Sequence, residues 1–410
     1  MNLDENNAGN LLGPLADDPP RPSSVDIARA MREGQRIRRT RRAALASGAA
    51  GFTAIVLVAL PFGLRSAGTD KSEVSEKSPA ATTGAPASAS ASPSTSPSST
   101  PTPSVSASRA PAKLPTQCAA ERLPVPDNVA KSLVTAADPA GRWIFGRSYP
   151  GQGATQVLLW SDGKATKISI PGDDQTIEAV NAAGVAVGQS FVGGEQVAWV
   201  YRDGKATQLA GSDARAQGIN ASGTIVGARA GQPVRWPSAG SEPVSLQVPD
   251  GAKGGAAEAV DDDGTAVGYV TVAGQRQAYV WSGDGKGRPL PEYGEPEDSA
   301  AFTVRNGWAT GLSGSVGTRW NLRTGQVEPV PGLQVRPSTA NAAGWMVGTD
   351  REGRGVLIGT GGSMRLPDVF VHRSGEFSNL PTALSDDGRV IAGQADDADG
   401  VIHAVAWRCR

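Results

Sequence analysis

Few side chains in this chain can carry catalytic, metal-binding or redox chemistry. The 410 residues contain two histidines, His372 and His403, and two cysteines, Cys118 and Cys409. A serine nucleophile would need one of these histidines as its general base, and the sequence has no Gly-x-Ser-x-Gly elbow to present such a serine. We therefore predict that the chain is not an enzyme, that no residue is catalytic, and that no cofactor is bound.

The two histidines occupy different settings. His403 lies at a strand position that sibling repeats fill with glutamine, which favours a hydrogen-bonded structural histidine. His372 lies in the insertion "DVFVHRSGEF", the longest departure from the repeat spacing, where it could line a surface pocket. The sequence assigns neither histidine to a ligand.

Acidic clusters are the other candidates for chemistry. The runs "VDDDG" at 260–264 and "SDDG" at 385–388 coincide with a recurring turn, and turn formation explains them. Asp397 and Asp399 precede Gly400, but no acidic residue follows at the distance that a calcium loop needs. We favour turn chemistry over calcium and predict no metal site.

A repeated phrase defines the elements that position these residues. From Lys131 onward, variants such as "AVNAAGVAVG" and "GINASGTIVG" recur seven times. The first glycine after each polar turn is Gly141, Gly184, Gly223, Gly264, Gly307, Gly344 or Gly388. Their mean spacing of about 41 residues is typical of a four-stranded propeller blade. The sequence predicts an all-β, seven-bladed β-propeller.

Each copy can be divided into four strands. A short apolar strand leads into the Asn or Asp turn, and a second strand returns from it. A third strand ends in an aromatic residue, and a fourth ends in proline. The third-strand residues are Trp160, Trp199, Trp236, Trp281, Trp320 and Trp407, with Val356–Ile358 in the sixth copy. Their regular recurrence favours core packing between blades over a sugar-stacking face.

The seventh copy ends three residues after Trp407 and lacks a fourth strand. Residues 118–127, "CAAERLPVPD", precede the first copy and are similar to the fourth strands elsewhere. We predict that this segment completes the last blade, so that the ring has no open edge. A Cys118–Cys409 disulfide would then replace the missing hairpin turn. Two unpaired buried thiols and an intermolecular bridge are the alternatives.

The first 116 residues differ in composition from the repeats. Residues 1–42 include six arginines between Arg32 and Arg42, and residues 43–64 carry no charge. We predict a cytoplasmic stub over 1–42, a transmembrane helix over 43–65, a disordered Ser/Pro/Thr/Ala-rich linker over 66–116, and the propeller over 117–410. The positive-inside rule places the propeller outside a cell membrane that the chain crosses once. A disulfide agrees with that oxidising location.

The phrase "[IV]-N-x-x-G-x-[IV]-V-G" followed by "x-A-x-x-W" resembles the HAF-type extracellular repeats of bacteria, and "HAVAWR" at 403–408 is close to the motif that names them. The resemblance covers about residues 131–408. It implies an extracellular repeat fold and no particular activity. Most copies here replace the histidine by Gln or Pro. The Arg-rich stub, single anchor and Ser/Pro stalk also resemble the architecture of actinobacterial surface proteins.

We expect a monomeric, non-catalytic binding module at the cell surface, attached to the membrane by its one transmembrane helix. Its ligand would be a surface protein or a cell-wall polymer. Nucleic acid is not expected, because basic residues outside the stub are scattered among acidic ones. Two alternatives remain: a cell-wall or exopolysaccharide lyase or hydrolase with its site in the propeller channel, and a sensor that couples the outer domain to residues 1–42.

Overall fold

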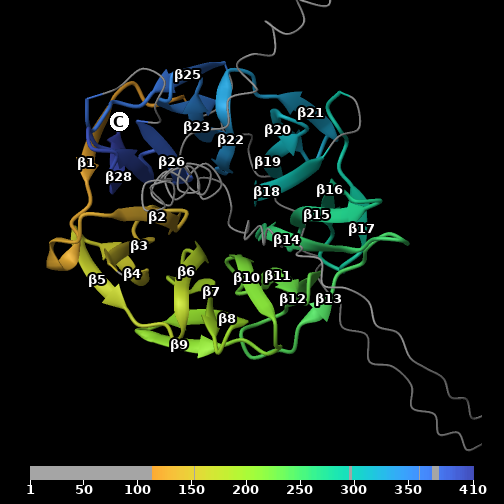
Figure 1. Cartoon of the computed structure of the whole chain (residues 1–410). Coiled ribbons are helices and arrows are strands. Elements are labelled where there is room, and N and C mark those ends of the chain that lie inside the picture. Colours follow the sequence, from red (N-terminus) through yellow and green to blue (C-terminus); the bar gives the residue numbers. More distant parts are fainter. Residues whose placement is uncertain (1–112, 152, 295–297, 360, 372–377) are drawn as a thin grey trace, which may run out of the picture. The chain divides into compact units, whose positions relative to one another are not determined.

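The computed structural model describes residues 113–410, apart from 152, 295–297, 360 and 372–377. These residues form seven four-stranded antiparallel sheets and one short 3₁₀ helix, η1 (Pro126–Asn128). The sheets are arranged as blades around a central axis, with one strand of each blade facing that axis (Figure 1). The predicted seven-bladed β-propeller is confirmed.

Every blade is built from four strands in the same order from the axis outward. The innermost strands are β2 (Ser132–Ala137), β6 (Asp173–Val180), β10 (Ala214–Ile219), β14 (Gly254–Val260), β18 (Ser299–Arg305), β22 (Leu333–Ala340) and β26 (Asn379–Leu384). The second strands are β3 (Ile144–Gly151), β7 (Ala186–Val192), β11 (Ile225–Arg229), β15 (Ala266–Val272), β19 (Trp308–Ser313), β23 (Met346–Asp350) and β27 (Val390–Asp396). The third strands are β4 (Ala154–Ser161), β8 (Glu195–Arg202), β12 (Gln232–Trp236), β16 (Gln275–Trp281), β20 (Val316–Asn321), β24 (Gly355–Gly359) and β28 (Ile402–Cys409). The outer strands are β5 (Lys164–Ile168), β9 (Lys205–Gln208), β13 (Val244–Ser245), β17 (Gly287–Pro289), β21 (Gln326–Pro329), β25 (Gly362–Arg365) and β1 (Cys118–Arg122).

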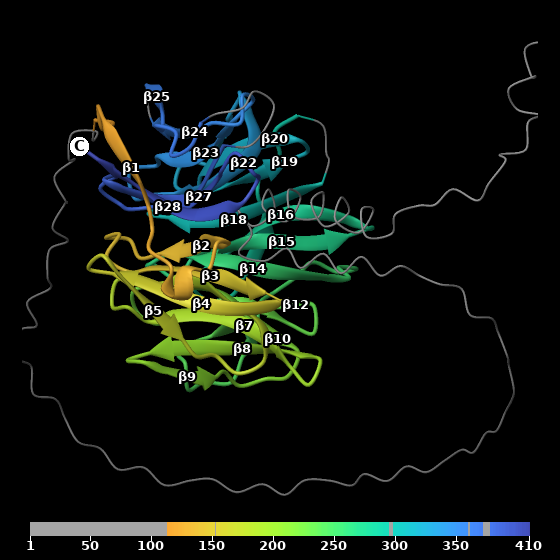
Figure 2. The same cartoon turned by 60° about the vertical axis from the view of Figure 1, so that its left-hand side comes forward.

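The last blade is completed by the segment that precedes the first. Strand β1 pairs antiparallel with β28, and Cys118 lies directly opposite Cys409. Figure 2 shows β1 beside β28 close to the carboxyl end. A disulfide joins the two cysteines, which are 291 residues apart in the sequence. The predicted closure and the predicted disulfide are both confirmed.

The turn between the first and second strands has the same construction in most blades. All seven predicted turn glycines adopt positive φ, between 68° and 86°, a region that glycine enters at little steric cost. In the second blade, Asn181 Oδ1 accepts the N–H groups of Ala183 and Val185 at 3.0 and 3.1 Å. This Asx turn explains why the repeat begins with Asn or Asp.

These turns also bond each blade to the next at one rim of the ring. Asn181 Nδ2 donates to the carbonyl oxygen of Asn220, and Asn220 Nδ2 donates to that of Asp261, both at 3.0 Å. The remaining five contacts complete the circuit: Gly307 N to Asp261 Oδ2, Asn306 Nδ2 to Ala342 O, Asn341 Nδ2 to Ser385 O, Asp386 N to Pro139 O and Arg142 Nη2 to Ala182 O. We call this set the turn ring.

Tryptophans on the third strands of five blades each bond their blade to the one before it. Five indole N–H groups donate to a carbonyl in the link after the preceding outer strand, at 2.6–2.9 Å. The pairs are Trp160–Pro124, Trp236–Ala210, Trp281–Gln247, Trp320–Pro291 and Trp407–Pro367. All five side chains are at most 3% exposed. The predicted core role of these residues is confirmed.

The second blade departs from the prediction for Trp199. The residue at the shared third-strand position is Tyr201, which lies opposite Ala186 as Trp236 lies opposite Ile225. Trp199 comes two residues earlier and donates to Ser190 Oγ at 2.8 Å within its own blade. Trp199 is 7% exposed in the cluster between the first two blades, so its predicted core role is confirmed. Only its placement at the shared position was wrong, because β8 continues past Trp199 to Arg202, and residues two apart share a face of a strand.

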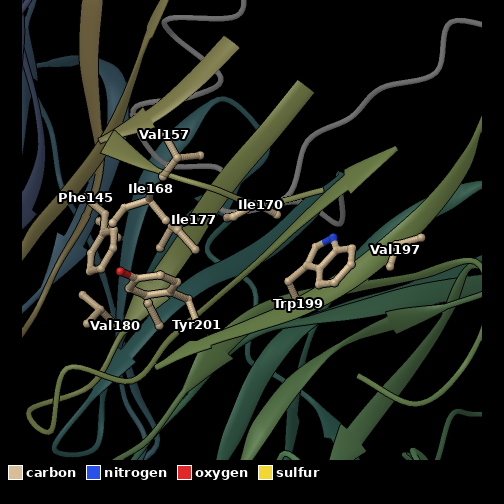
Figure 3. Close-up of a cluster of buried hydrophobic side chains, with 11 residues drawn as sticks. Phe145, Val157, Ile168, Ile170, Ile177, Val180, Val197, Trp199 and Tyr201 are labelled. Atoms are coloured by element: carbon tan, nitrogen blue, oxygen red, sulfur yellow. The ribbon is translucent and has the colours of Figure 1, made fainter. Parts of the chain in front are cut away.

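Apolar side chains fill the spaces between adjacent blades. Figure 3 shows the cluster between the first two blades, where Phe145, Ile177 and Tyr201 converge. Phe145 meets Tyr201 edge to face, with ring centroids 6.0 Å apart. Both faces of each sheet are therefore buried, which explains why the second strands lack a polar face.

Residues 1–112 lie outside the described residues, and with them the predicted stub, transmembrane helix and most of the linker. No helix in the part of the chain that the structure describes is long and apolar enough to span a bilayer. At the described end, Leu114 packs against the cluster between the sixth and seventh blades. The backbone N–H of Thr116 donates to the carbonyl oxygen of Arg410 at 2.9 Å. Ordered contacts thus begin before Cys118.

We predict that loss of the disulfide lowers the free energy of unfolding. Closing a loop of this length is worth about 5 kcal/mol in the loop-entropy model, as an upper figure. Cys118→Ser, Cys409→Ser and the double variant should lose the same amount, because each breaks the same bond. Guanidinium denaturation of the wild type with and without reductant provides the comparison. Equal midpoints for the oxidised and reduced protein would contradict the prediction.

Candidate functional site

The innermost strands of all seven blades enclose a cavity on the central axis. It has a volume of about 180 Å³, and every blade contributes side chains from the last residues of its innermost strand. The turn ring lies at one end of this cavity, because each innermost strand leads directly into its turn. We call this space the chamber.

A β-bulge near the end of each innermost strand shapes the chamber. Six blades have a register shift that leaves one residue without a direct partner on the second strand, and in the sixth blade the shift spans residues 335–339. The bulge residues, all lining the chamber, are Thr135, Glu178, Gln217, Glu258, Phe302, Ser338 and Thr382. We call them the bulge ring. Bulges commonly re-aim a side chain in this way next to functional sites.

A glycine on the second strand makes room for each of these bulges in six blades. In the second blade, a Cβ on Gly188 would collide with the carbonyl oxygen of Thr176, and in the third, one on Gly227 would collide with that of Arg215. These are the final glycines of the repeated phrase. An isolated glycine inside a strand signals a bulge, so the sequence held a sign of the bulge ring that our prediction did not use.

Three consecutive blades place polar side chains in the bulge ring. Gln217 and Glu258 are each 1% exposed, and Gln217 Nε2 donates to Glu258 Oε2 at 3.4 Å. Glu178 is half-buried and accepts a long hydrogen bond of 3.5 Å from Gln189 Nε2. Gln217 Oε1 is buried and has no hydrogen-bond partner among the described residues. This side of the chamber is rich in hydrogen-bond acceptors.

Glu178 is the titratable group most perturbed by this setting. Burial raises the pKa of its carboxyl to about 7. The positive charges of Arg147 and Arg215 act against this rise, and the nearby Glu258 adds to it. Glu178 therefore exchanges its proton close to neutral pH.

The other four members of the bulge ring are apolar or carry hydroxyls. Phe302 follows Glu258 around the ring and is 2% exposed. Thr382 Oγ1 is bonded to the carbonyl oxygens of Val134 and Ala392, at 3.3 and 3.4 Å. Thr135 Oγ1 is buried with no partner in the described part of the chain. The ring is thus asymmetric, with carboxyl and amide groups on the second to fourth blades.

An arginine crosses the chamber at the level of the turn ring. Arg305, from the fifth blade, pairs with Asp262 of the fourth and Asp386 of the seventh, each at 2.7 Å. Asp386 also accepts the backbone N–H of Ala342 from the sixth blade at 3.0 Å. The two aspartates came from the acidic runs that we assigned to turns. Both lie in the predicted turns, where Asp263 and Asp387 accept the N–H groups of Thr265 and Arg389. The carboxyl groups of Asp262 and Asp386 instead form an ion-pair strap between blades that the sequence did not indicate.

His403 and Asp397 meet far from the chamber, on the last blade. His403 Nδ1 accepts from Arg122 Nη2 at 2.9 Å, so its Nε2 carries the proton and donates to Asp397 Oδ2 at 2.8 Å. Asp397 Oδ1 also accepts the N–H groups of Asp399 and Val401, both at 2.9 Å. Although burial acts against it, these bonds hold the pKa of Asp397 below its usual value. The structural role predicted for His403 is confirmed; His372 lies outside the described residues.

No protein-family model matches the chain, and no curated protein matches it. Solved structures resemble it at 12% identity. TolB from Acinetobacter baumannii has a TM-score of 0.36 over 49% of this chain and 55% of TolB, about half its length. An oligogalacturonate lyase from Vibrio parahaemolyticus has a TM-score of 0.49 over 72% and 96%, and U3-55K one of 0.47 over 70% and 98%. The class of the protein therefore rests on its own architecture, a seven-bladed β-propeller closed by a disulfide.

We predict that Glu178 makes stability depend on pH. The folded state keeps this proton up to about pH 7, whereas the unfolded chain releases it near 4.5, so stability should fall as pH rises between these values. Glu178→Gln cannot ionise. The melting temperature of the variant minus that of the wild type should therefore be a few degrees more positive at pH 8 than at pH 5. Differential scanning fluorimetry across this range measures the effect.

Glu195→Gln is the matched control for that experiment, since Glu195 lies exposed on the same blade. Its difference from wild type should not change with pH. If the two variants gave parallel profiles, the proposed burial of an ionising Glu178 would be refuted.

Proposed function

We propose that the propeller is a non-catalytic binding module held outside the cell by a single membrane-spanning segment. The uncharged residues 43–64, with six arginines on their amino side, support the anchor and its orientation. The Cys118–Cys409 disulfide supports an oxidising location for the propeller. The Ser/Pro-rich residues between these parts would hold the propeller away from the membrane surface.

One observation carries the binding role: the repeats retain their scaffold positions but differ at the position that faces the chamber. The turn glycines and the third-strand aromatics recur nearly unchanged around the ring. The bulge ring instead combines carboxyl, amide, phenyl and hydroxyl groups. A site placed on a repeated scaffold has this pattern, since the scaffold residues serve packing and the varied ones serve recognition.

The size and lining of the chamber define what it can accept. It holds one small polar molecule or the end of a larger one, because its volume is about 180 Å³ and its buried acceptors lie on one side. A cell-wall polymer or surface protein would therefore insert a terminal group or side chain and make its other contacts on the rim.

The carboxyl pair supports an enzyme as a second candidate function. Glu178 and Glu258 both line the chamber, and the raised pKa of Glu178 suits a general acid. A glycoside hydrolase uses such a pair, with one carboxyl group as the general acid. We favour binding because Gln217 already holds Glu258 by a hydrogen bond.

The test uses the full-length protein, a chamber-filling variant and wall-polymer and surface-protein fractions. Ala179→Met adds uncharged bulk at a position that lines the chamber, whereas Ala154→Met adds the same bulk at an exposed position. We expect Ala179→Met to lower the affinity for the fraction that the wild type binds about tenfold or more, a change of about 1.4 kcal/mol in binding free energy. Ala154→Met should bind as wild type does.

Release of soluble sugar is measured in the same incubations. Turnover that Glu178→Gln and Glu258→Gln both abolish would establish the enzyme instead. Equal binding by the two methionine variants would show that the chamber is not the site.

A further inference from the structure

The chamber contains a buried acceptor that the protein leaves unpaired. Gln217 is 1% exposed, its Nε2 is used by Glu258, and its Oε1 has no partner among the described residues. An unsatisfied buried carbonyl oxygen destabilises the folded protein, because its hydrogen bonds to water are lost and not replaced. A hydrogen-bond donor placed in the chamber would remove that cost.

The neighbours of Gln217 call for a donor that carries positive charge. Glu178 on one side and Glu258 on the other both line the chamber, one blade away in each direction. Next in the ring is the phenyl group of Phe302, whose face attracts cations. Carboxyl groups, an amide oxygen and an aromatic ring together are complementary to an organic cation.

We propose that Glu178, Gln217, Glu258 and Phe302 form a binding site for a primary ammonium group. This assignment rests on the proposed binding function and names the chemistry of its ligand. Three N–H donors would serve Gln217 Oε1 and the two carboxyl groups, while Phe302 would cover the remaining side. The rest of the ligand would extend through the chamber.

Other cations fit these four residues less well. Calcium takes 6–8 oxygen ligands, and the described residues contain no group of three or more His, Cys, Asp or Glu side chains that could hold a metal. A quaternary ammonium has no N–H group and would leave Gln217 Oε1 unpaired. A neutral hydroxyl can serve Gln217, but it gains little from the carboxyl groups.

The volume of the chamber limits the ligand to a small amine or the amino end of a larger molecule. At about 30 Å³ for each water in the liquid, it corresponds to roughly six waters. One amino sugar or amino alcohol is of this size. A free amine and an amine on a wall polymer share this chemistry, so the experiment separates them.

Titration calorimetry of the full-length protein in detergent at pH 8 tests the proposal with matched probes. Ethanolamine and 3-amino-1,2-propanediol remain ammonium ions at this pH; ethylene glycol and glycerol are their neutral counterparts. Each ammonium probe should bind at least about tenfold more tightly than its counterpart. A lysine hexamer, whose side-chain amines are protonated at this pH, tests an amine carried on a polymer, and calcium chloride tests the metal.

Isosteric variants assign the contact to these residues. Glu258→Gln keeps an oxygen for the Gln217 amide but removes the charge, and should weaken ammonium binding about tenfold or more. Phe302→Leu should weaken it about two- to fivefold. Glu195→Gln, on the surface, should leave it unchanged, and the melting temperature of each variant shows that it is folded.

Each result bears on the proposal. Equal binding of charged and neutral probes, binding of calcium alone, or ammonium binding unaffected by Glu258→Gln would overturn it. The proposed binding function would survive that failure if the wild type still bound wall polymer or surface protein and Ala179→Met bound it more weakly. If that binding were absent as well, both would fail.

Discussion

The structure depends on the meeting of its two ends in one sheet. Every other blade closes locally, because a hairpin joins its third strand to its fourth. The last blade has no such hairpin, and the pairing of β1 with β28 is the step at which the ring either closes or leaves an open edge. The disulfide acts on that step alone, since it joins the two strands at their shared end. Packing between the first and seventh blades in turn requires the closed ring.

The turn ring shows how one repeated turn can bond to neighbouring blades that present different backbone groups. Asn181 and Asn220 each need an acceptor for their own turn and a donor for the next blade, and the amide side chain provides both. At the fourth blade the residue is Asp261, because there the fifth blade presents N–H groups instead of a carbonyl. In these three blades the choice between Asn and Asp therefore follows from what the neighbouring turn offers. A substitution at one turn changes the contact between two blades.

The sequence predicted the elements whose signals are local and periodic. The turn glycines, strand order, fourth-strand segment and cysteine pair all follow from comparing the copies with one another. Trp199 was misassigned because two aromatics, Trp199 and Tyr201, lie on the same face of one strand. The chamber could not be predicted in the same way. Which side chains face the axis depends on a one-residue bulge, and the pairing of Arg305 with Asp386 joins the fifth and seventh blades across the ring.

The chamber carries costs that the scaffold must offset. A carboxyl whose pKa is about 7 and an amide oxygen without a partner both disfavour the folded state. They lie at bulge positions, where a side chain faces the axis and does not separate two blades. The tryptophan bonds and the turn ring hold the blades together independently of what the bulge ring contains. For this reason phenylalanine, glutamate and threonine all occur at equivalent bulges, and recognition can change there while the seven-bladed frame stays the same.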